Sequence, residues 1–215
     1  PGSTFKPFVY SVIFNKGYTT DTLLFDTSIQ FSPACAPDDF TTDETCYSPG
    51  NYDERFRGPI TIRNALAQSV NIPAVEALYL AGIKNSVDLA KSVGIESLTE
   101  LDAYGLSLVL GGGSVSLLDM TSAYSVFAND GIRNPYNPIL RVEDASGNIV
   151  DRYSIFPRRV LSAQNARTIS SILSDNVART PAYGANSTLY VASRDLAVKT
   201  GTSNDYKDAW ILGYT

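Results

Sequence analysis

The sequence predicts a mixed, helix-rich α/β fold, formed by one domain that covers residues 1–215. Of the 215 residues, 44% are hydrophobic and 18% are charged, which supplies one substantial core but is too polar for a membrane-spanning protein. Apolar residues recur at helical spacing through the middle of the chain, and strand-like runs follow near its end. No repeat with a period of about 20–50 residues is evident, which argues against a solenoid.

The first half of the chain is predicted to form helices on both sides of a long loop. Residues 3–15 place apolar side chains at helical spacing, and Pro7 lies early enough in this buried helix to cost little backbone hydrogen bonding. Residues 17–58, rich in prolines and acidic side chains, are predicted to be a loop-rich insertion. Two short helices, 61–69 and 73–80, should follow, with a hinge between them.

The second half is predicted to alternate helices with hairpins. Ser116 stands in capping-box spacing with Asp119, and Ser162 should cap a long helix that reaches about residue 177. Turn residues interrupt two alternating apolar runs, which predicts antiparallel hairpins. The predicted elements are helices 86–93 (closed by Gly94), 116–129 and 162–177, and hairpins 139–155 and 196–214 with turns at 146–148 and 203–205, whereas the run 106–110 is ambiguous.

Charge is unevenly distributed along the chain. The net charge is −5, and residues 38–57 carry six acidic side chains against two arginines. A solvated loop is favoured there over a calcium site, because no EF-hand spacing is present. The overall acidity makes nucleic acid a poor partner, because phosphate binding needs a basic surface.

The sequence contains no histidine, which excludes Ser-His-Asp catalysis, Cys-His catalysis and histidine-ligated zinc. Any catalysis would therefore use lysine, carboxylate, hydroxyl or thiol groups. Cys35 and Cys46 could close a short disulfide outside the cytosol or could remain free thiols. Two cysteines without histidine cannot build an ordinary structural zinc site, so we expect neither a metal nor a cofactor.

Ser3 and Lys6 form an S-x-x-K motif where the first helix is predicted to start, and residues three apart share a helix face. The lysine amine could therefore take the proton of the serine hydroxyl. Near neutral pH this requires the lysine pKa to fall by about 3 units from about 10.4, which demands burial or a second cation. The motif is expected about 0.6 times by chance, so taken alone it favours a capped helix with an exposed lysine.

Two further motifs follow along the chain. Ser69 and Asn71 form S-x-N in the predicted hinge, where a hydroxyl and a carboxamide can both face a cleft. Residues 199–202 read Lys-Thr-Gly-Thr, and K-T-G is expected only about 0.03 times by chance. On a strand, this string presents a cation and two hydroxyls beside a glycine that lets a ligand backbone approach, which suits a peptide carrying a carboxylate. The plainer alternative is an edge strand with a solvated lysine.

In their order, S-x-x-K, S-x-N and K-T-G resemble the signature of class A β-lactamases and penicillin-binding proteins. Segments 58–66, 120–131 and 208–215 look like class A penicillin-binding protein transpeptidase domains, so the resemblance covers essentially the whole chain. It implies a partial transpeptidase or serine β-lactamase-like fold, with a helical subdomain and part of an antiparallel sheet. Val198 departs from the family, which commonly carries glycine before the K-T-G lysine.

The resemblance implies roles for the motif residues in catalysis. Ser3 would be the acylated nucleophile, and Lys6 would accept its proton. Ser69 would relay a proton to the leaving amine, and Lys199 would complete the catalytic set. The backbone N–H groups of Ser3 and Thr202 would form the oxyanion hole.

Substrate binding is implied for the remaining motif residues. Asn71 would hold the peptide carbonyl or a side chain of the substrate. Thr200 and Thr202 would bind the terminal carboxylate together with Lys199, and Gly201 would keep that strand open. The implied ligands are peptidoglycan stem peptides and β-lactam antibiotics.

The implied function is a D,D-transpeptidase that cross-links peptidoglycan through a serine acyl-enzyme on D-Ala-D-Ala stem peptides and that β-lactams inhibit covalently. One alternative is a D,D-carboxypeptidase or β-lactam hydrolase, although no E-x-x-L-N string supplies the glutamate that such β-lactamases use. Another is a noncatalytic β-lactam-sensing or cell-wall-binding module. Both chain ends look cut, so we expect a truncated domain of a bacterial parent protein with a membrane anchor and a glycosyltransferase domain, at the extracytoplasmic face of the cell membrane.

Overall fold

The core of the molecule is built around one buried helix, α1 (Lys6–Asn15), in a computed structural model that describes residues 1–99, 104–203 and 207–215. Helices α3 (Asn71–Ala81), α4 (Ile83–Val93) and α6 (Ala163–Leu173) pack around α1. Because neighbours cover α1 on several sides, its apolar residues are buried all round and not along one stripe.

The first helix begins three residues later than the sequence predicts. Residues Gly2–Phe5 form a 3₁₀ turn, η1, in which the Thr4 N–H donates to the Pro1 carbonyl at 3.3 Å. Pro7 has no N–H and so cannot donate the α-helical bond to the carbonyl of Ser3. The Lys6 N–H bonds that carbonyl instead, which closes a tighter turn. Ser3 therefore lies on a 3₁₀ turn rather than in a helix.

The remaining helices mostly match the predicted positions. Ser116 caps α5 (Leu117–Ala128) by accepting from the Asp119 N–H, and Gly94 ends α4 in the left-handed conformation. The helix predicted to run from Ser162 to about residue 177 is shorter in the structure and ends at Leu173. A second helix then begins, and the Asp175 side chain caps its first turn. The other helical elements are α2 (Ile62–Ala67), the 3₁₀ turn η3 (Leu106–Leu110), which settles the ambiguous run, α5 (Leu117–Ala128) and α7 (Asn176–Tyr183).

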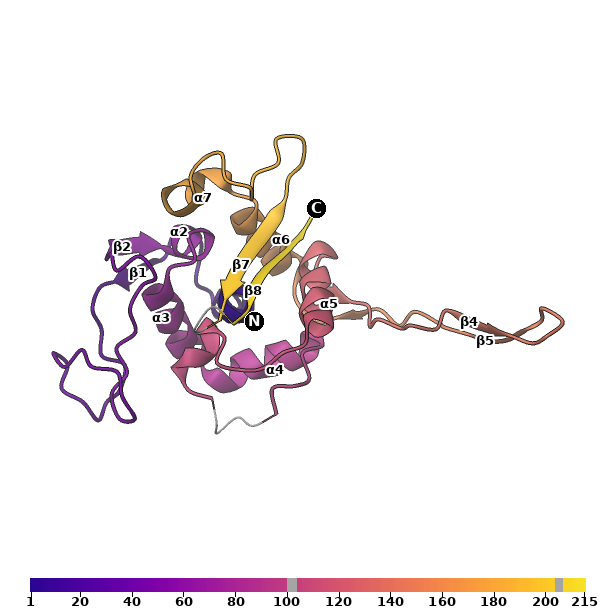
Figure 1. Cartoon of the computed structure of the whole chain (residues 1–215), viewed down its shortest axis with the longest axis horizontal. Coiled ribbons are helices and arrows are strands. Elements are labelled where there is room, and N and C mark those ends of the chain that lie inside the picture. Colours follow the sequence, from indigo (N-terminus) through magenta and orange to yellow (C-terminus); the bar gives the residue numbers. More distant parts are fainter. Residues whose placement is uncertain (100–103, 204–206) are drawn as a thin grey trace.

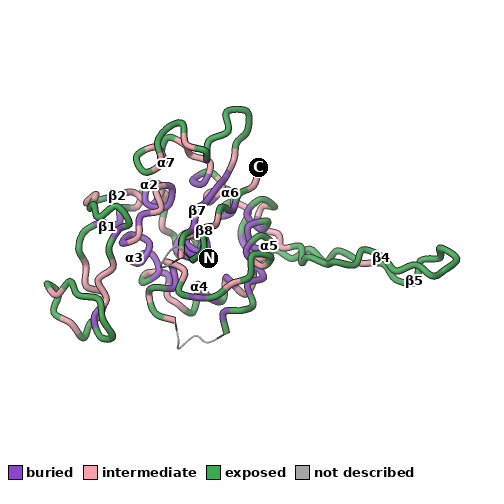
Figure 2. The backbone as a smooth tube through the Cα atoms, viewed as in Figure 1, coloured by how far each residue is buried: buried purple, intermediate pink, exposed green. Residues whose placement is uncertain are grey.

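The described strands pair in four two-stranded antiparallel sheets. Both predicted hairpins are confirmed, although residues 204–205 of the second predicted turn lie outside the described residues. The first hairpin, β4 with β5, projects from the body and is exposed along its length (Figures 1 and 2). The pairs are β1 (Leu23–Asp26) with β2 (Gly58–Thr61), β3 (Ile132–Arg133) with β6 (Arg158–Arg159), β4 (Arg141–Glu143) with β5 (Ile149–Arg152), and β7 (Ala197–Thr202) with β8 (Ala209–Tyr214).

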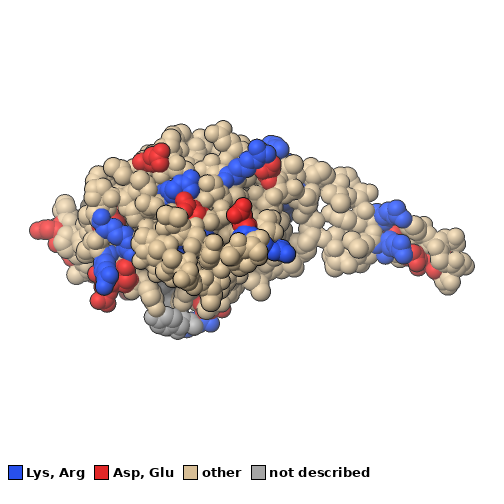
Figure 3. Space-filling view, turned by 90° about the horizontal axis from the view of Figure 1, so that it is seen from above, with Lys and Arg blue, Asp and Glu red and all other residues tan. Residues whose placement is uncertain are grey.

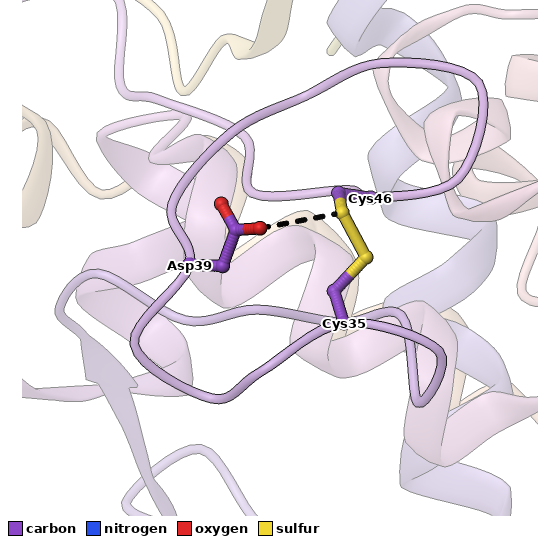
Figure 4. Close-up of side chains that lie close together, drawn as sticks. All are labelled: Cys35, Asp39 and Cys46. Carbon is purple, nitrogen blue, oxygen red and sulfur yellow. Dashed lines mark hydrogen bonds between the residues drawn. A yellow bond between two sulfur atoms is a disulfide. The ribbon is translucent and has the colours of Figure 1, made fainter.

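The segment predicted as a loop-rich insertion, 17–58, contains strand β1 and one disulfide. Cys35 and Cys46 are bonded, which resolves the alternative left open by their spacing (Figure 4). The Asp39 Oδ2 atom lies 3.7 Å from Cys46 Sγ, and because a disulfide sulfur carries no proton this is a contact without a donor. Neither sulfur is a thiolate, so this Cys-Asp-Cys cluster lacks the ligands of a zinc site.

The surface carries charges of both signs. Figure 3 shows acidic and basic side chains interleaved over the body and along the projecting hairpin. In the described part of the chain, no helix has both the length and the apolar character needed to cross a bilayer.

Candidate active site

The three motifs meet at one cavity of about 820 Å³. The turn η1 supplies Ser3, the connection between α2 and α3 supplies Ser69, and strand β7 supplies Thr200, although these segments are far apart in the sequence. The two lysines lie behind this wall, since Lys6 is 0% exposed and Lys199 is 3% exposed. The lining residues are Ser3, Asn51, Tyr52, Asp53, Arg55, Arg57, Gln68, Ser69, Val70, Asn71, Leu110, Pro181, Ala182, Tyr183, Thr200, Gly201, Thr202 and Ser203.

The Lys6 amine is directed at the S-x-N segment. Its Nζ donates to the carbonyl oxygens of Ser69 at 2.7 Å and Val70 at 3.1 Å, and to Oδ1 of Asn71 at 2.8 Å. Ser69 adopts a φ of 60°, an uncommon conformation for a residue with a side chain, and this turn aims its carbonyl at the lysine. The S-x-N turn is thus bound to the S-x-x-K helix through one amine.

Lys199 holds the same serine from the other side. Its Nζ donates to Ser69 Oγ at 2.7 Å and to the carbonyl oxygen of Thr200 at 2.8 Å. Strand β7 presents this lysine because its partner β8 fixes the register, with Lys199 opposite Leu212. Ser69 therefore joins the two lysines, one through its carbonyl and one through its hydroxyl.

Burial makes both lysines weaker bases than free lysine. Desolvation lowers the pKa of Lys6 well below its usual value, and the charge of Lys199 lowers it further. Desolvation also lowers the pKa of Lys199 to about 7, with a smaller effect from the buried guanidinium of Arg179. The pKa of Lys6 is therefore shifted in the direction that the S-x-x-K interpretation requires.

Ser3 lines the cavity, and its hydroxyl has no hydrogen-bond partner among the described residues. The spacing in S-x-x-K predicts that Ser3 and Lys6 share a face, yet the Lys6 amine contacts the S-x-N segment instead. The turn itself is firmly held, because the buried Tyr124 hydroxyl donates to the Thr4 carbonyl at 2.7 Å.

Gly2 and Gly201 allow η1 to lie against strand β7, and Gly111, which follows η3, allows that turn to approach η1. A Cβ at Gly2 would stand 2.5 Å from the Thr202 carbonyl oxygen, and one at Gly201 would stand 2.3 Å from the Pro1 carbonyl oxygen. A Cβ at Gly111 would stand 2.3 Å from the Gly2 nitrogen. The side of Gly201 on which a Cβ would stand is therefore occupied by η1 of the same chain, although Gly201 also lines the cavity.

Two residues that contact the motifs were not predicted from the sequence. The Tyr183 hydroxyl lies 2.9 Å from Thr200 Oγ1, and the side chain of Asn51 bonds the backbone of Asn71. Asn51 sits between a glycine and a charged run in the predicted loop, so nothing in the local sequence marks it as buried. Tyr183 ends helix α7, of which only the first two residues were predicted to be helical, as the end of the helix from Ser162.

The chain is similar to known proteins over its whole length. Residues 1–215 match the family model described as "Penicillin binding protein transpeptidase domain". The chain is 36% identical over 221 residues to penicillin-binding protein 1A of Neisseria meningitidis serogroup A, an alignment that covers 100% of this chain and 26% of that protein. The chain thus spans about a quarter of the length of such curated relatives.

Solved structures show the same fold. A crystal structure of penicillin-binding protein 1A from Haemophilus influenzae aligns with a TM-score of 0.80 at 27% identity, covering 99% of this chain and 36% of that one. The structure of PonA1 from Mycobacterium tuberculosis aligns with a TM-score of 0.80 at 25% identity, covering 100% of this chain and 56% of that one. The predicted fold class is confirmed by these similarities.

Proposed function

Because this chain belongs to the penicillin-binding protein transpeptidase family, we propose that it forms peptide cross-links in peptidoglycan through an acyl-enzyme on Ser3. The observation that carries the proposal is the convergence of the three motifs on one cavity, with two buried lysines bonded to the same serine. Such an arrangement provides a nucleophile, a proton acceptor and a proton relay without any histidine.

Acylation begins with attack of Ser3 Oγ on the carbonyl carbon between the two D-alanines of a stem peptide. The hydroxyl proton moves to the neutral amine of Lys6, and the C–N bond to the terminal D-alanine breaks as Ser69 delivers a proton to the leaving nitrogen. Lys199 returns a proton to Ser69, whose hydroxyl it contacts at 2.7 Å. An amine of a second stem peptide then attacks the ester and forms the new amide as the bond to Ser3 Oγ breaks. Lys6 returns its proton to Ser3 Oγ, and the proton lost by the attacking amine passes through Ser69 to Lys199.

The hydrogen bonds of Lys6 indicate which contact is lost when its ammonium group gives up a proton. An ammonium has three N–H groups, and three acceptors surround this one. A neutral amine has two N–H groups and a lone pair, so it releases one acceptor. The carbonyls of Ser69 and Val70 are fixed in the backbone, and we therefore assign the released acceptor to the Asn71 side chain.

The substrate carboxylate is proposed to bind the K-T-G strand. Lys199 would supply the positive charge, and the hydroxyls of Thr200 and Thr202 would donate hydrogen bonds. The backbone N–H groups of Ser3 and Thr202 are proposed to stabilise the oxyanion, because η1 and β7 lie within contact distance at Gly2.

We further propose that the domain works at the extracytoplasmic face of the bacterial membrane, within a longer protein that carries a membrane anchor and a glycosyltransferase domain. The Cys35–Cys46 disulfide supports an oxidising compartment. The chain spans 26% of the length of a curated relative, which leaves room for those further parts in a longer protein.

The direct test is to incubate the protein with benzylpenicillin and map the adduct by peptide mass spectrometry. We expect one penicilloyl group, located on Ser3. An adduct on another residue, or no adduct at all, would contradict the assignment of Ser3 as the acylated residue. Incubation with a stem-peptide donor and an amine acceptor then separates the possible reactions: an amide product supports transpeptidation, a free acid indicates a carboxypeptidase, and a stable adduct without turnover indicates a sensor.

Affinity for a carboxylate-bearing β-lactam is expected to fall as the pH rises through about 7. Burial lowers the pKa of Lys199 to about 7, so its positive charge is present below that pH and lost above it. The loss approaches tenfold for each pH unit above the pKa. Equilibrium binding to the Ser3→Ala variant, between about pH 6 and about pH 9, measures this without covalent reaction.

The matched variant is Lys199→Arg, whose guanidinium stays charged over this range. It should give a flat profile, even if its absolute affinity is lower. A flat profile in the protein with Lys199 intact would show that this lysine does not supply the charge that binds the carboxylate.

A further inference from the structure

The side chain of Asn51 is buried in the wall of the cavity and uses all of its hydrogen-bonding groups. It is 8% exposed. Its Nδ2 donates to Asp26 Oδ1 at 2.6 Å and to the Arg55 carbonyl at 2.7 Å. Its Oδ1 accepts from the N–H groups of Asn71 at 3.0 Å and Ile72 at 3.3 Å. One amide therefore connects the acidic loop, strand β1 and helix α3.

Asn51 caps helix α3 from outside that helix. The first N–H groups of a helix have no partner within it, and the N-cap residue here, Val70, has no side-chain acceptor to offer. The Oδ1 atom of Asn51 satisfies the first two of these groups, on Asn71 and Ile72. The start of α3 is thereby fixed in position relative to the loop.

The same loop fixes the direction of the Asn71 amide. Asn71 Nδ2 donates to the Gly50 carbonyl at 3.1 Å, which turns Oδ1 toward the Lys6 amine at 2.8 Å. A rotated amide would present N–H groups to Lys6 in place of an acceptor. Gly50 and Asn51 therefore hold the backbone and side chain of the same asparagine.

The orientation of Asn51 is itself determined by a buried carboxylate. Asp26 is 0% exposed, and its other oxygen accepts from the Arg57 backbone N–H at 3.0 Å and lies 3.3 Å from the Arg57 guanidinium. A carboxylate accepts and does not donate, so it draws the Nδ2 side of Asn51 toward itself. The Oδ1 side is left facing helix α3.

We propose that Asn51 is a positioning residue, which holds the S-x-N segment so that Asn71 offers an acceptor to the Lys6 amine. The inference rests on the proposed function, because Lys6 matters as the proton acceptor of Ser3. Asn51 hydrogen-bonds neither Ser3 nor Lys6, so it acts on Lys6 through the start of helix α3, where Asn71 lies.

The test compares Asn51→Ala with Asn165→Ala. Asn165 is also buried, at 5% exposed, and its Nδ2 also donates twice, to the Ser11 carbonyl at 2.8 Å and to Asn15 Oδ1 at 2.9 Å, so it matches Asn51 in burial and in donor bonds. We expect Asn51→Ala to slow penicillin acylation by about 10²-fold, because small displacements of a catalytic group have effects of this size. Asn165→Ala should lower the melting temperature while acylation stays near the wild-type rate.

A second readout does not depend on acylation. In protein labelled with ¹³C at lysine Cε, the Lys6 signal reports the ionisation of its amine. We expect the Lys6 pKa to fall further in Asn51→Ala, because an acceptor that favours the ammonium is no longer held in place. If the wild-type protein is not acylated, the proposed function fails, whereas the shift of the Lys6 signal still decides the role of Asn51.

Exchanging the side chains of residues 26 and 51 distinguishes a lost interaction from a misfolded variant. In the double variant Asp26→Asn with Asn51→Asp, the donor and acceptor are swapped, and a carboxylate still faces the N–H groups of α3. Acylation should recover relative to Asn51→Asp alone, in which two carboxylates oppose each other. The inference is overturned if Asn51→Ala retains the wild-type rate and Lys6 titration, or if the exchange recovers nothing.

Discussion

Replacement of Lys6 by methionine is expected to slow acylation of Ser3 by about 10²- to 10⁴-fold, the range that a positioned proton acceptor contributes. Methionine is unbranched and apolar, so it fits the buried space that the lysine stem occupies. It has no lone pair on nitrogen to take the serine proton. The rate of labelling by a fluorescent penicillin measures the change, and the Ser3→Ala variant gives the background labelling.

The matched control for this variant is Lys16→Met. Lys16 follows the same helix, and its Nζ also donates to a backbone carbonyl, that of Leu80 at 2.7 Å, but the residue is exposed and away from the cavity. Its replacement should leave acylation unchanged. If Lys6→Met were acylated as fast as Lys16→Met, the proton of Ser3 would have to leave by another group, and Ser69 with Lys199 would be the next pair to test.

The stability of Lys6→Met distinguishes a loss of chemistry from a loss of structure. The substitution removes a desolvated amine, which favours folding, but leaves three oxygen acceptors without their donor, which opposes it. These contributions have opposite signs, so we expect a change in the free energy of unfolding that is small beside the change in rate. A melting curve near that of the parent protein is the check.

Local chemistry was enough to predict many of the elements. Ser116 and Ser162 cap helices where the sequence places them, and Gly94 ends α4, because each acts on N–H or carbonyl groups within a few residues. The break between α6 and α7 was missed because Asp175 had no proline or glycine beside it to signal a helix end. The strands β1 and β2 were missed because their pairing joins residues that are far apart in sequence.

The candidate site shows the same division between local and distant causes. The family resemblance implied that Ser3, Ser69 and the K-T-G strand share one site, and the structure brings them to one cavity. The direction of the Lys6 amine could not be predicted, because it depends on carbonyls that are more than 60 residues away in the chain. Asn51 was hidden for the same reason, since its partners on α3 are 20 and 21 residues further along.

Gly201 gives the second large effect, since Gly201→Ala is expected to slow acylation by about 10²-fold, the size of effect that a displacement of about 1 Å produces. The added Cβ would lie 2.3 Å from the Pro1 carbonyl oxygen and 2.8 Å from the Thr4 nitrogen. Both are backbone atoms, so no flexible side chain can move aside. Strand β7 and the turn η1 must separate, which moves Ser3 away from the K-T-G residues.

Gly213→Ala is the control on the other strand of the same hairpin. Its Cβ would lie 3.0 Å from the Ala197 carbonyl oxygen and 3.5 Å from the next nearest atoms, so a shift of a few tenths of an ångström relieves the contact. Fluorescent-penicillin labelling rates and melting temperatures of both variants should be measured together. Because Ser3, Lys6 and Lys199 remain intact in Gly201→Ala, a rate loss beyond that of Gly213→Ala would come from their spacing. An unchanged rate would mean that acylation does not require η1 to contact strand β7.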